Sequence, residues 1–583
     1  MKQLLPLIPY LKKYRKKLFF GFLFIVVSIF LASMYPLVLG EAVDELSNKT
    51  SNHSFLYYGL FSVSIVLVGG IFLYFTRQMI IVVSREIEND LRYDFFSSLQ
   101  YLDKTYYNTT TTGDIMAHAT NDINNIRNFL GPGIMYSMQT LLRIIVTLII
   151  LFKINSEITF ISLLPLPLIS YLVYKVMKQT YNRSMKVQES FSTMTTKAQE
   201  NFSGIRVIKS YIREKFEIEE FIKLSLDYQN KNLSLARLQA YSFPMMFLLT
   251  GLSIILVIYF GGLKYINGQM SLGNITEFMV YMGQLTWPMI AFGWIINLVQ
   301  RASPSMQRLM KIMNIKPSIA DNDKTSSEIK LENIRGNIEF RNVSFKYPGT
   351  EEYILKNINL SIPAGTTLGI IGHTGEGKST LINLIPRTYD VTEGNIYIDD
   401  YEITRLPIGT LRKSIGIVPQ ESFLFSDTLE KNISYSSDLT NEDEVLNASK
   451  ISGLFKDVIL FPEKFKTILG ERGITLSGGQ KQRTTIARAV YMKPKILILD
   501  DCLSAVDTHT EEEILTELRK VMKERTSIII SHRISTIKNA DKIIVLQDSE
   551  IKEQGTHQEL LDLGETYYNI YQKQLLEEEI EEI

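Results

Sequence analysis

The sequence is 583 residues long, which exceeds one ordinary domain and predicts at least two. Its 62 lysines and arginines balance 62 aspartates and glutamates, so it lacks the basic excess that nucleic-acid binding requires. Cys502 is the single cysteine, which excludes an internal disulfide and a cysteine-ligated metal cluster. Because of the charge balance, we expect no nucleic-acid partner.

Long apolar stretches dominate the first half of the sequence. Four of these stretches carry no charged residue. A fifth contains Arg143, and a sixth is shorter. Each is long enough to cross ~30 Å of hydrocarbon as a helix. They predict a membrane all-α bundle within residues 1–315, with six transmembrane helices and long cytoplasmic extensions. The six predicted spans are 18–40, 55–76, 131–152, 158–174, 238–263 and 278–300.

The charges that flank these spans predict their orientation. A cluster of lysines and arginines at 12–17 precedes the first span, and the following loop, 41–54, carries three acidic residues and one lysine. Because basic residues stay on the cytoplasmic side, the N-terminus is expected there. Alternation then places the C-terminus in the cytoplasm too. This pattern is typical of a multi-pass protein of the cell membrane.

Three residues within the spans are candidates for a substrate cavity. Arg143 lies inside a span, where a charge is costly and usually faces a cavity or a partner. A structural ion pair, with Glu277 as one option, is an equally good explanation. Trp287 and Trp294 belong to a region rich in aromatic and methionine side chains, which suits varied amphipathic molecules. Packing between helices or against lipid explains the two tryptophans equally well.

The second half of the sequence contains a phosphate-binding motif. A predicted strand ends in a glycine-rich loop that fits the P-loop pattern at every fixed position. Glycines let backbone N–H groups turn toward phosphates, the lysine reaches the β- and γ-phosphates, and the serine hydroxyl ligates Mg²⁺. The motif predicts a bound ATP. Its residues are Gly372, His373, Thr374, Gly375, Glu376, Gly377, Lys378, Ser379 and Thr380.

Two further motifs make the nucleotide site more specific. The apolar strand 496–500 ends in Asp500, which is placed to help hold Mg²⁺, and "LSGGQKQR" occupies 476–483. Together with the P-loop these motifs resemble the ATP-binding cassette (ABC) family. The resemblance implies an α/β P-loop NTPase cassette with a helical subdomain over 336–583, joined to the membrane bundle by a linker at 316–335.

The resemblance implies roles for further residues. Tyr347 matches the aromatic residue that stacks on adenine, and His532 matches the switch histidine that contacts the γ-phosphate and orients the attacking water. Gln420 matches the glutamine that senses Mg²⁺, so the implied metal ligands are Ser379, Gln420 and Asp500. The residues implied to act on the ATP of a partner subunit, or to communicate with it, are Ser477, Gly478, Gly479, Gln480 and Asp507.

The membrane half shares the resemblance. Residues 111–127 and 200–214 are similar to the two cytoplasmic coupling regions of ABC exporters, and 268–278 is similar to the entry to their sixth span. His118 departs from the arginine that many members carry, which puts one contact to the cassette in doubt. The fusion of both halves in one chain favours export.

Asp501 occupies the position at which a catalytic glutamate is expected. Aspartate is shorter by one C–C bond, ~1.5 Å, and a misplacement of ~1 Å can cost ~10²-fold in rate. Asp501 is combined here with an intact motif at 476–480. This combination resembles the degenerate-site subunit of bacterial heterodimeric multidrug ABC exporters. The alternative is that a backbone shift compensates and the site works normally.

These observations predict an ABC-type ATPase coupled to transport. We expect ATP-driven export of hydrophobic or amphipathic, drug-like compounds, with ATP and Mg²⁺ as cofactors and with reduced turnover at this chain's own P-loop. The expected partners are the lipid bilayer, a lipophilic small-molecule substrate and a second half-transporter subunit with a glutamate base. A homodimeric lipid flippase and an ATP-gated channel or regulatory subunit are the alternatives.

Overall fold

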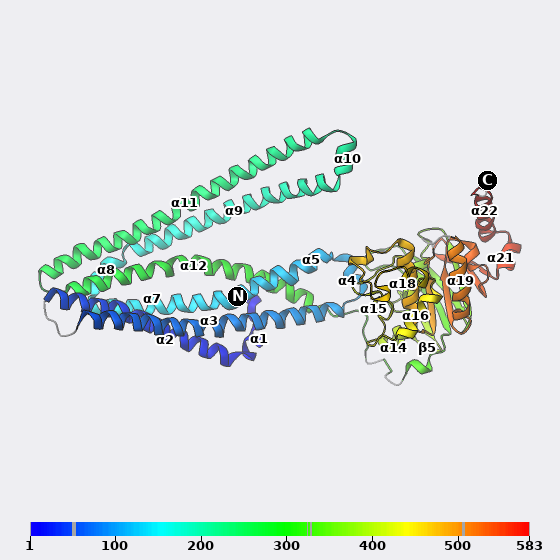
Figure 1. The fold of residues 1–583 in the computed structure, drawn as a ribbon, viewed down its shortest axis with the longest axis horizontal. Coiled ribbons are helices and arrows are strands. Elements are labelled where there is room, and N and C mark those ends of the chain that lie inside the picture. The colour runs from blue at the N-terminus through cyan, green and yellow to red at the C-terminus, as the bar shows by residue number, and fades with distance from the viewer. Residues whose placement is uncertain (1, 49–53, 323–324, 327–328, 504–507, 582–583) are drawn as a thin grey trace. The chain divides into compact units, whose positions relative to one another are not determined.

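The computed structural model describes the whole chain except residues 1, 49–53, 323–324, 327–328, 504–507 and 582–583, which Figure 1 draws in grey. The described residues form two compact units. The membrane unit comprises Met1–Tyr101 and Thr111–Ile315, and the cassette unit comprises Leu102–Thr110 and Lys316–Ile583. A short segment from the first half of the chain, 102–110, thus packs with the cassette.

The membrane unit is entirely helical in its described part. Its long helices are joined by short helical turns, among them the π-helical turns His118–Asp122 and Phe129–Gly133. The helices are α1 (Ile8–Lys13), α2 (Arg15–Asn48), α3 (Phe55–Gln100), α5 (Thr112–Ala117), α6 (Ile123–Asn128), α7 (Ile134–Ile154), α8 (Ser156–Leu163), α9 (Pro165–Ser203), α10 (Ile205–Ser210), α11 (Glu214–Ile266) and α12 (Leu272–Met313).

Four helical segments among the described residues are long and apolar enough to cross a membrane, namely Arg15–Ser47, Phe55–Gln100, Thr112–Ile154 and Leu272–Met313. Thr250–Ile266 is a shorter apolar stretch at the end of α11. The predicted span 158–174 is divided between α8 and α9 at Leu164, because Pro165 begins a new helix. Proline is well placed at the first position of a helix, where its missing N–H costs nothing.

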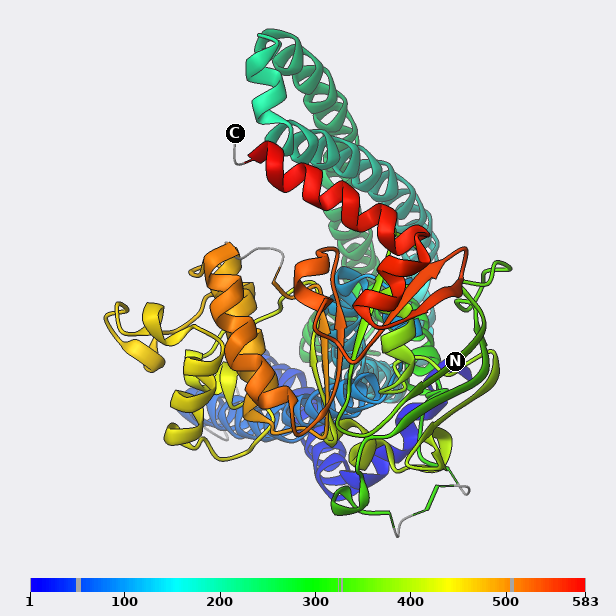
Figure 2. The same cartoon turned by 90° about the vertical axis from the view of Figure 1, so that its right-hand side faces the viewer.

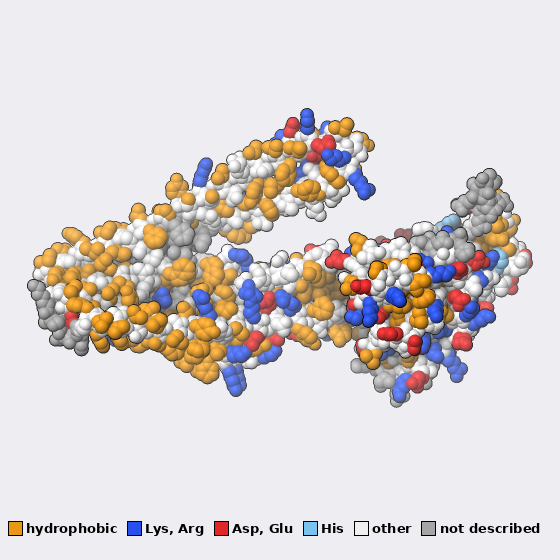
Figure 3. Space-filling model, in the orientation of Figure 1, with side chains coloured by type: hydrophobic (Ala, Val, Ile, Leu, Met, Phe, Trp, Pro, Cys, Tyr) orange, Lys and Arg blue, Asp and Glu red, His pale blue; other side chains and the backbone are white. Residues whose placement is uncertain are grey.

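The polar extensions of the membrane helices lie at the ends of the apolar segments. α9 and α11 run beside each other and are joined by the turn at α10 (Figure 1). Hydrophobic side chains cover the end of the unit where α2 is followed by α3, whereas charged side chains gather at the α10 turn (Figure 3). Nearer the N-terminus, Lys13 pairs with Asp90 at 2.7 Å and Lys17 pairs with Glu86 at 2.5 Å. An apolar surface with charged ends is what a lipid bilayer requires.

The cassette unit contains two sheets. The four-stranded antiparallel sheet has the order β2-β1-β4-β5, and the six-stranded sheet has the order β10-β9-β3-β8-β7-β6. In the larger sheet β9, β3, β8, β7 and β6 are parallel, and β10 pairs antiparallel with β9. The strands are β1 (Ile338–Phe345), β2 (Leu355–Ile362), β3 (Thr367–Gly372), β4 (Glu393–Ile398), β5 (Tyr401–Glu402), β6 (Ile415–Val418), β7 (Ile496–Asp500), β8 (Thr526–Ile530), β9 (Lys542–Gln547) and β10 (Glu550–Gly555).

The helices of the cassette unit cover the larger sheet and also form a separate helical part of that unit. Figure 2 shows the last helix, α22, in red. The helices of the cassette unit are α4 (Lys104–Thr109), α13 (Lys378–Leu384), α14 (Ile408–Lys413), α15 (Leu429–Ile433), α16 (Glu442–Ile451), α17 (Phe455–Val458), α18 (Gly478–Tyr491), α19 (Thr508–Met522), α20 (Ile534–Ile537), α21 (His557–Leu563) and α22 (Thr566–Glu581).

The central strands of the larger sheet are continuous apolar runs because both of their faces are buried. All five residues of β7 and all five of β8 are buried. Successive residues of β7 contribute to two different cores, with Leu497 and Leu499 on one face and Ile496 and Ile498 on the other. This packing fixes the strands, and with them the loops that follow their carboxyl ends.

Candidate functional site

The P-loop connects β3 to α13. Gly372, Gly375 and Gly377 have φ values of 157°, 94° and 87°, a region that side chains other than glycine rarely adopt. At Gly372 a Cβ atom would lie 2.3 Å from the carbonyl oxygen of Leu546 on β9, so only glycine fits there. A tight glycine turn of this kind can direct backbone N–H groups toward a phosphate.

Lys378 lies at the centre of this loop with 7 % of its surface exposed. Its Nζ atom donates hydrogen bonds to the carbonyl oxygens of Gly372, at 2.8 Å, and His373, at 2.7 Å. Burial lowers the pKa of Lys378, although the nearby carboxylates of Asp501, Asp500 and Glu376 act in the opposite direction. The loop therefore holds a cation with its donors directed inward, which suits the β- and γ-phosphates of a nucleotide.

The two strongest candidates for metal ligands meet at the end of β7. The Ser379 hydroxyl donates to Asp500 Oδ1 at 3.2 Å, and Asp500 is 6 % exposed. Burial raises the pKa of Asp500, which the hydrogen bond from Ser379 partly offsets. One carboxylate and one hydroxyl are hard oxygen ligands, and Mg²⁺ at nucleotide sites typically binds such a small protein set together with phosphate oxygens. The residues present thus fit Mg²⁺ bound with a nucleotide.

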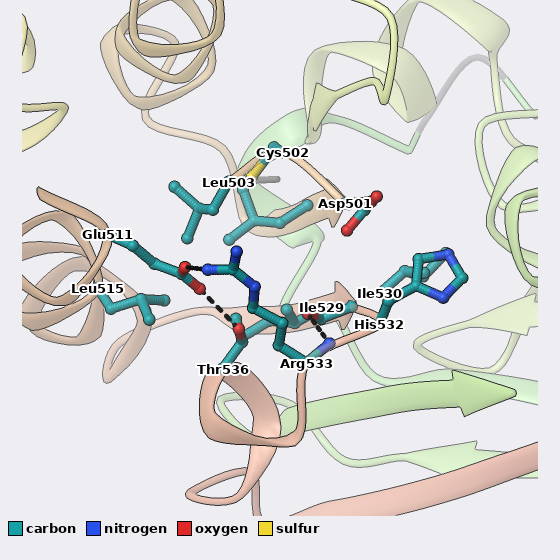
Figure 4. A pocket seen from close by; sticks show the side chains of 12 residues that line it. Asp501, Cys502, Leu503, Glu511, Leu515, Ile529, Ile530, His532, Arg533 and Thr536 are labelled. Atoms are coloured by element: carbon teal, nitrogen blue, oxygen red, sulfur yellow. Dashed lines mark hydrogen bonds and ion pairs between the residues drawn. The ribbon is translucent and has the colours of Figure 1, made fainter. Parts of the chain in front are cut away.

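Asp501 and His532 follow adjacent parallel strands, β7 and β8. Because carboxyl ends of parallel strands meet at one edge, the sheet brings both residues beside the P-loop edge. They line a shared pocket of about 200 Å³, and their side chains lie on the same side of it (Figure 4). Asp501 has a φ of 44°, a left-handed conformation in which aspartate is enriched among non-glycine residues. The residue type therefore suits this backbone position.

Tyr347 lies in a separate pocket of about 470 Å³ beside the P-loop helix. Its hydroxyl hydrogen-bonds with Thr380 Oγ1 at 2.9 Å, and its ring packs edge-on against Tyr389 at 5.3 Å. Asn108 of α4 donates to the Tyr389 hydroxyl at 2.8 Å, and Thr105 of α4 also lines the pocket. A flat aromatic residue in a cavity next to the P-loop is suited to a purine ring.

The "LSGGQ" residues lie on the helical part of the cassette. Ser477 is the N-cap of α18 and forms a capping box with Gln480. Ser477 and Gly478 are exposed, and Gly479 and Gln480 are partly exposed. Gln420, two residues beyond the end of β6, is exposed as well. Asp507 lies outside the described residues.

The predicted cavity residues are spread over two membrane helices. Arg143 is half-buried on α7, and Trp287 and Trp294 of α12 are 59 % and 39 % exposed. The Trp294 ring packs edge-on against Tyr136 at 5.5 Å. Glu277 lies against Gly40 of α2, and in the described part of the chain no ion pair joins it to Arg143.

His118 contributes to a polar cluster within the membrane unit. Its Nδ1 atom lies 2.7 Å from Asp122 Oδ2, and Asp122 is buried. Asp122 also accepts hydrogen bonds from Ser305, at 2.7 Å, and from Arg308 of α12. Asp122, with His118 bonded to it, thus ties the turn at 118–122 to α12.

Two residues beside the site were not predicted from the sequence. Glu511 of α19 is 5 % exposed, pairs with Arg533 and accepts from Thr536 at 2.9 Å (Figure 4). It shares a helix face with the buried Ile514 and Leu518, so helical periodicity was a usable signal for it. Gln574 of α22 hydrogen-bonds to the backbone around His532, and no sequence pattern indicates such a long-range contact.

The site combines a P-loop, an acidic strand end, a histidine after the adjacent strand and "LSGGQ" on the helical part. These features define an ATPase of the cassette class fused to a helical membrane bundle. Residues 18–289 match the family model "ABC transporter transmembrane region", and 355–504 match "ABC transporter". The chain belongs to the ABC exporter family as a half-transporter, with one transmembrane region and one ATPase cassette.

Similar proteins of this family come from several bacteria. The chain is 34 % identical to the multidrug resistance-like ATP-binding protein MdlA of Buchnera aphidicola subsp. Schizaphis graminum, covering 98 % of both chains. It is 33 % identical to the ATP-dependent lipid A-core flippase of Syntrophus aciditrophicus, covering 95 % of this chain and 91 % of that protein. Its fold matches the structure of a bacterial Atm1-family ABC exporter with ATP bound at a TM-score of 0.80 and 25 % identity, covering 96 % and 99 % of the two chains. The resemblance to the ABC family, the fold class and the ABC-type ATPase cassette are confirmed.

Proposed function

We propose that this half-transporter exports hydrophobic or amphipathic compounds from the cytoplasm, together with a second subunit that carries a glutamate at the position of Asp501. The observation that carries the proposal is the assembled sheet edge, where Lys378, Ser379 and Asp500 keep full binding chemistry while the adjacent carboxylate is one methylene short. Such a site binds ATP well and turns it over slowly.

The proposed roles rest on the resemblance to the ABC family, and the positions of the side chains support them. Lys378 binds the β- and γ-phosphates, Tyr347 stacks on the adenine, and His532 contacts the γ-phosphate. Ser379, Asp500 and Gln420 hold Mg²⁺, which supplies charge neutralisation at the phosphates when it is bound. Asp501 orients the attacking water with the shorter reach of aspartate. Under this proposal the site binds ATP and turns it over slowly.

The "LSGGQ" residues are proposed to serve the partner's nucleotide. The exposure of Ser477 and Gly478 at the start of α18 supports this role, because a helix start with free surface can approach a phosphate on another subunit. Asp507 is proposed to communicate between the two sites. An intact motif on a chain with a weak base leaves the partner-based site as the main site of hydrolysis.

Coupling to the membrane half is proposed to begin at α4. Asn108 reaches Tyr389, Tyr389 packs on Tyr347, and Tyr347 bonds to Thr380 of the P-loop helix. Nucleotide binding beside Tyr347 therefore acts on a segment that continues directly into α5 of the membrane unit. Both termini are placed in the cytoplasm, as the basic cluster at 12–17 predicts.

The relatives support two cargo classes. One is described as multidrug resistance-like and another as a lipid A-core flippase. The exposed Trp287 and the nearby Trp294 favour a lipophilic or amphipathic small molecule.

A transport measurement tests the proposal. Inverted membrane vesicles that contain the complex should accumulate an amphipathic cationic dye when ATP is added, and Lys378→Ala should abolish the accumulation. ATP-dependent movement of a labelled lipid without dye accumulation would favour the flippase. Electrical conductance without uphill transport would contradict both.

A further inference from the structure

The segment that carries His532 is held from two sides by side chains that lie outside the P-loop. Figure 4 shows one side, where Glu511 of α19 pairs with Arg533 and accepts from Thr536. On the other side, Gln574 of α22 uses both ends of its amide. Its Nε2 atom donates to the carbonyl oxygen of His532 at 2.5 Å, and its Oε1 atom accepts from the Ile534 N–H at 2.8 Å.

The imidazole of His532 depends on this backbone. His532 is exposed, and in the part of the chain that the structure describes no hydrogen bond from another side chain holds its ring. The backbone of His532 sets where its Cα–Cβ bond projects, so the restraint at residues 532 and 534 limits the positions that the ring can reach. The two bonds of Gln574 act directly on that backbone.

The position of Gln574 is fixed independently of these bonds. Glu553 accepts from the N–H groups of Thr566, at 2.6 Å, and Tyr567, at 3.1 Å, at the start of α22. Tyr567 is fully buried, and its hydroxyl bonds with His557 at 2.7 Å. Gln574 follows Tyr567 by about two helical turns. The helix is therefore anchored to the sheet before it reaches the switch segment.

We propose that Gln574 is a positioning residue of the ATPase reaction, and that α22 acts through it to hold His532 in register with the γ-phosphate. This inference rests on the proposed role of His532 as a γ-phosphate contact. It assigns the C-terminal helix a part in catalysis, because a shift of α22 would loosen the histidine without touching the nucleotide.

The test measures the affinity of the full-length protein in lipid for ATP and for ADP. The ratio of the two affinities reports on the γ-phosphate contact, because only ATP carries that phosphate, and the measurement needs no turnover. Gln574→Met keeps the length of the side chain and removes both hydrogen bonds. Gln574→Glu keeps the acceptor for Ile534 and removes the donor to His532. Gln572→Met, on the exposed face of the same helix, is the matched control, and His532→Ala is the reference.

We expect Gln574→Met and Gln574→Glu to reduce the preference for ATP over ADP by about 10-fold, the size of a lost hydrogen bond to a charged group, with ADP affinity unchanged. Gln572→Met should behave as the wild type. A wild-type preference in both Gln574 variants, beside a loss in His532→Ala, would overturn the positioning role alone. A wild-type preference in His532→Ala would overturn the proposed role of His532 and this inference with it.

Discussion

The Ser379 hydroxyl lies 3.2 Å from Asp500 Oδ1, although 121 positions separate the two residues in the sequence. One belongs to the helix that follows β3 and the other ends β7, so the parallel sheet alone brings them together. The pair makes a compact oxygen site at the P-loop edge of the sheet.

The first prediction concerns the cost of burying Asp500. Its pKa is raised by burial, so the carboxyl stabilises the fold most when it is protonated, below the unfolded value of ~3.9. That contribution is lost as the pH rises through the pKa of the folded state. Asp500→Asn should therefore raise the thermal midpoint of the nucleotide-free protein at neutral pH, by ~2–4 °C for each kcal/mol gained, and the gain should shrink on acidification.

The same substitution should weaken Mg²⁺-dependent ATP binding at this chain's own P-loop, because the amide cannot replace a carboxylate at the metal. Thermal unfolding of the full-length protein in detergent, followed from neutral to acidic pH, checks the stability effect. An Asp500→Asn midpoint below that of the wild type at neutral pH would contradict it.

Lys378→Ala should weaken ATP binding by roughly 10- to 100-fold, because it removes charge-assisted hydrogen bonds to phosphate. Equilibrium binding of a fluorescent ATP analogue measures the loss. Lys356→Ala removes an exposed lysine side chain from the same unit and should bind as the wild type. Equal losses in the two variants would show that bulk charge, not the P-loop contact, drives binding.

Gly273 of α12 is expected to set how closely α12 approaches α2. A Cβ atom there would lie 2.2 Å from the Gly40 carbonyl oxygen and 2.5 Å from Asp44 Oδ2, and the Gly273 N–H donates to Asp44 Oδ1 at 2.6 Å. Gly273→Ala should cost ~1–3 kcal/mol of stability through overpacking. Gly283→Ala on the same helix meets nothing within 4 Å and should leave the thermal midpoint unchanged. Identical midpoints for both variants would refute the close contact.

The sequence predicts those parts of the site whose chemistry is local. The P-loop needs glycines at fixed spacings, and Asp500 ends an apolar strand, so both are visible in a single stretch of residues. Membrane helices are visible for the same reason, since ~20 apolar residues in a row suffice.

Contacts that depend on tertiary packing were not visible. Gln574 reaches His532 only because α22 is anchored at Glu553 and then runs past the end of β8. Likewise, α4 packs with the cassette through Asn108 and Tyr389, just before the region 111–127 in which coupling was expected. The interruption between α8 and α9 at Leu164 could have been predicted from Pro165. The span 158–174 was predicted from apolar composition, which does not show where a helix is interrupted.

The central claim is that Asp501 is a weak catalytic base. ATP turnover by the full-length chain alone in lipid tests this claim most directly. Four proteins are compared: the wild type, Asp501→Glu, Asp501→Asn and the blank Lys378→Ala. The account predicts that the wild type and Asp501→Asn stay close to the blank, while Asp501→Glu gains at least ~10-fold because the longer side chain reaches the water. A wild-type rate within the usual ~1–10³ per second, lost in Asp501→Asn and not raised in Asp501→Glu, would contradict it and show that the aspartate is an adequate base.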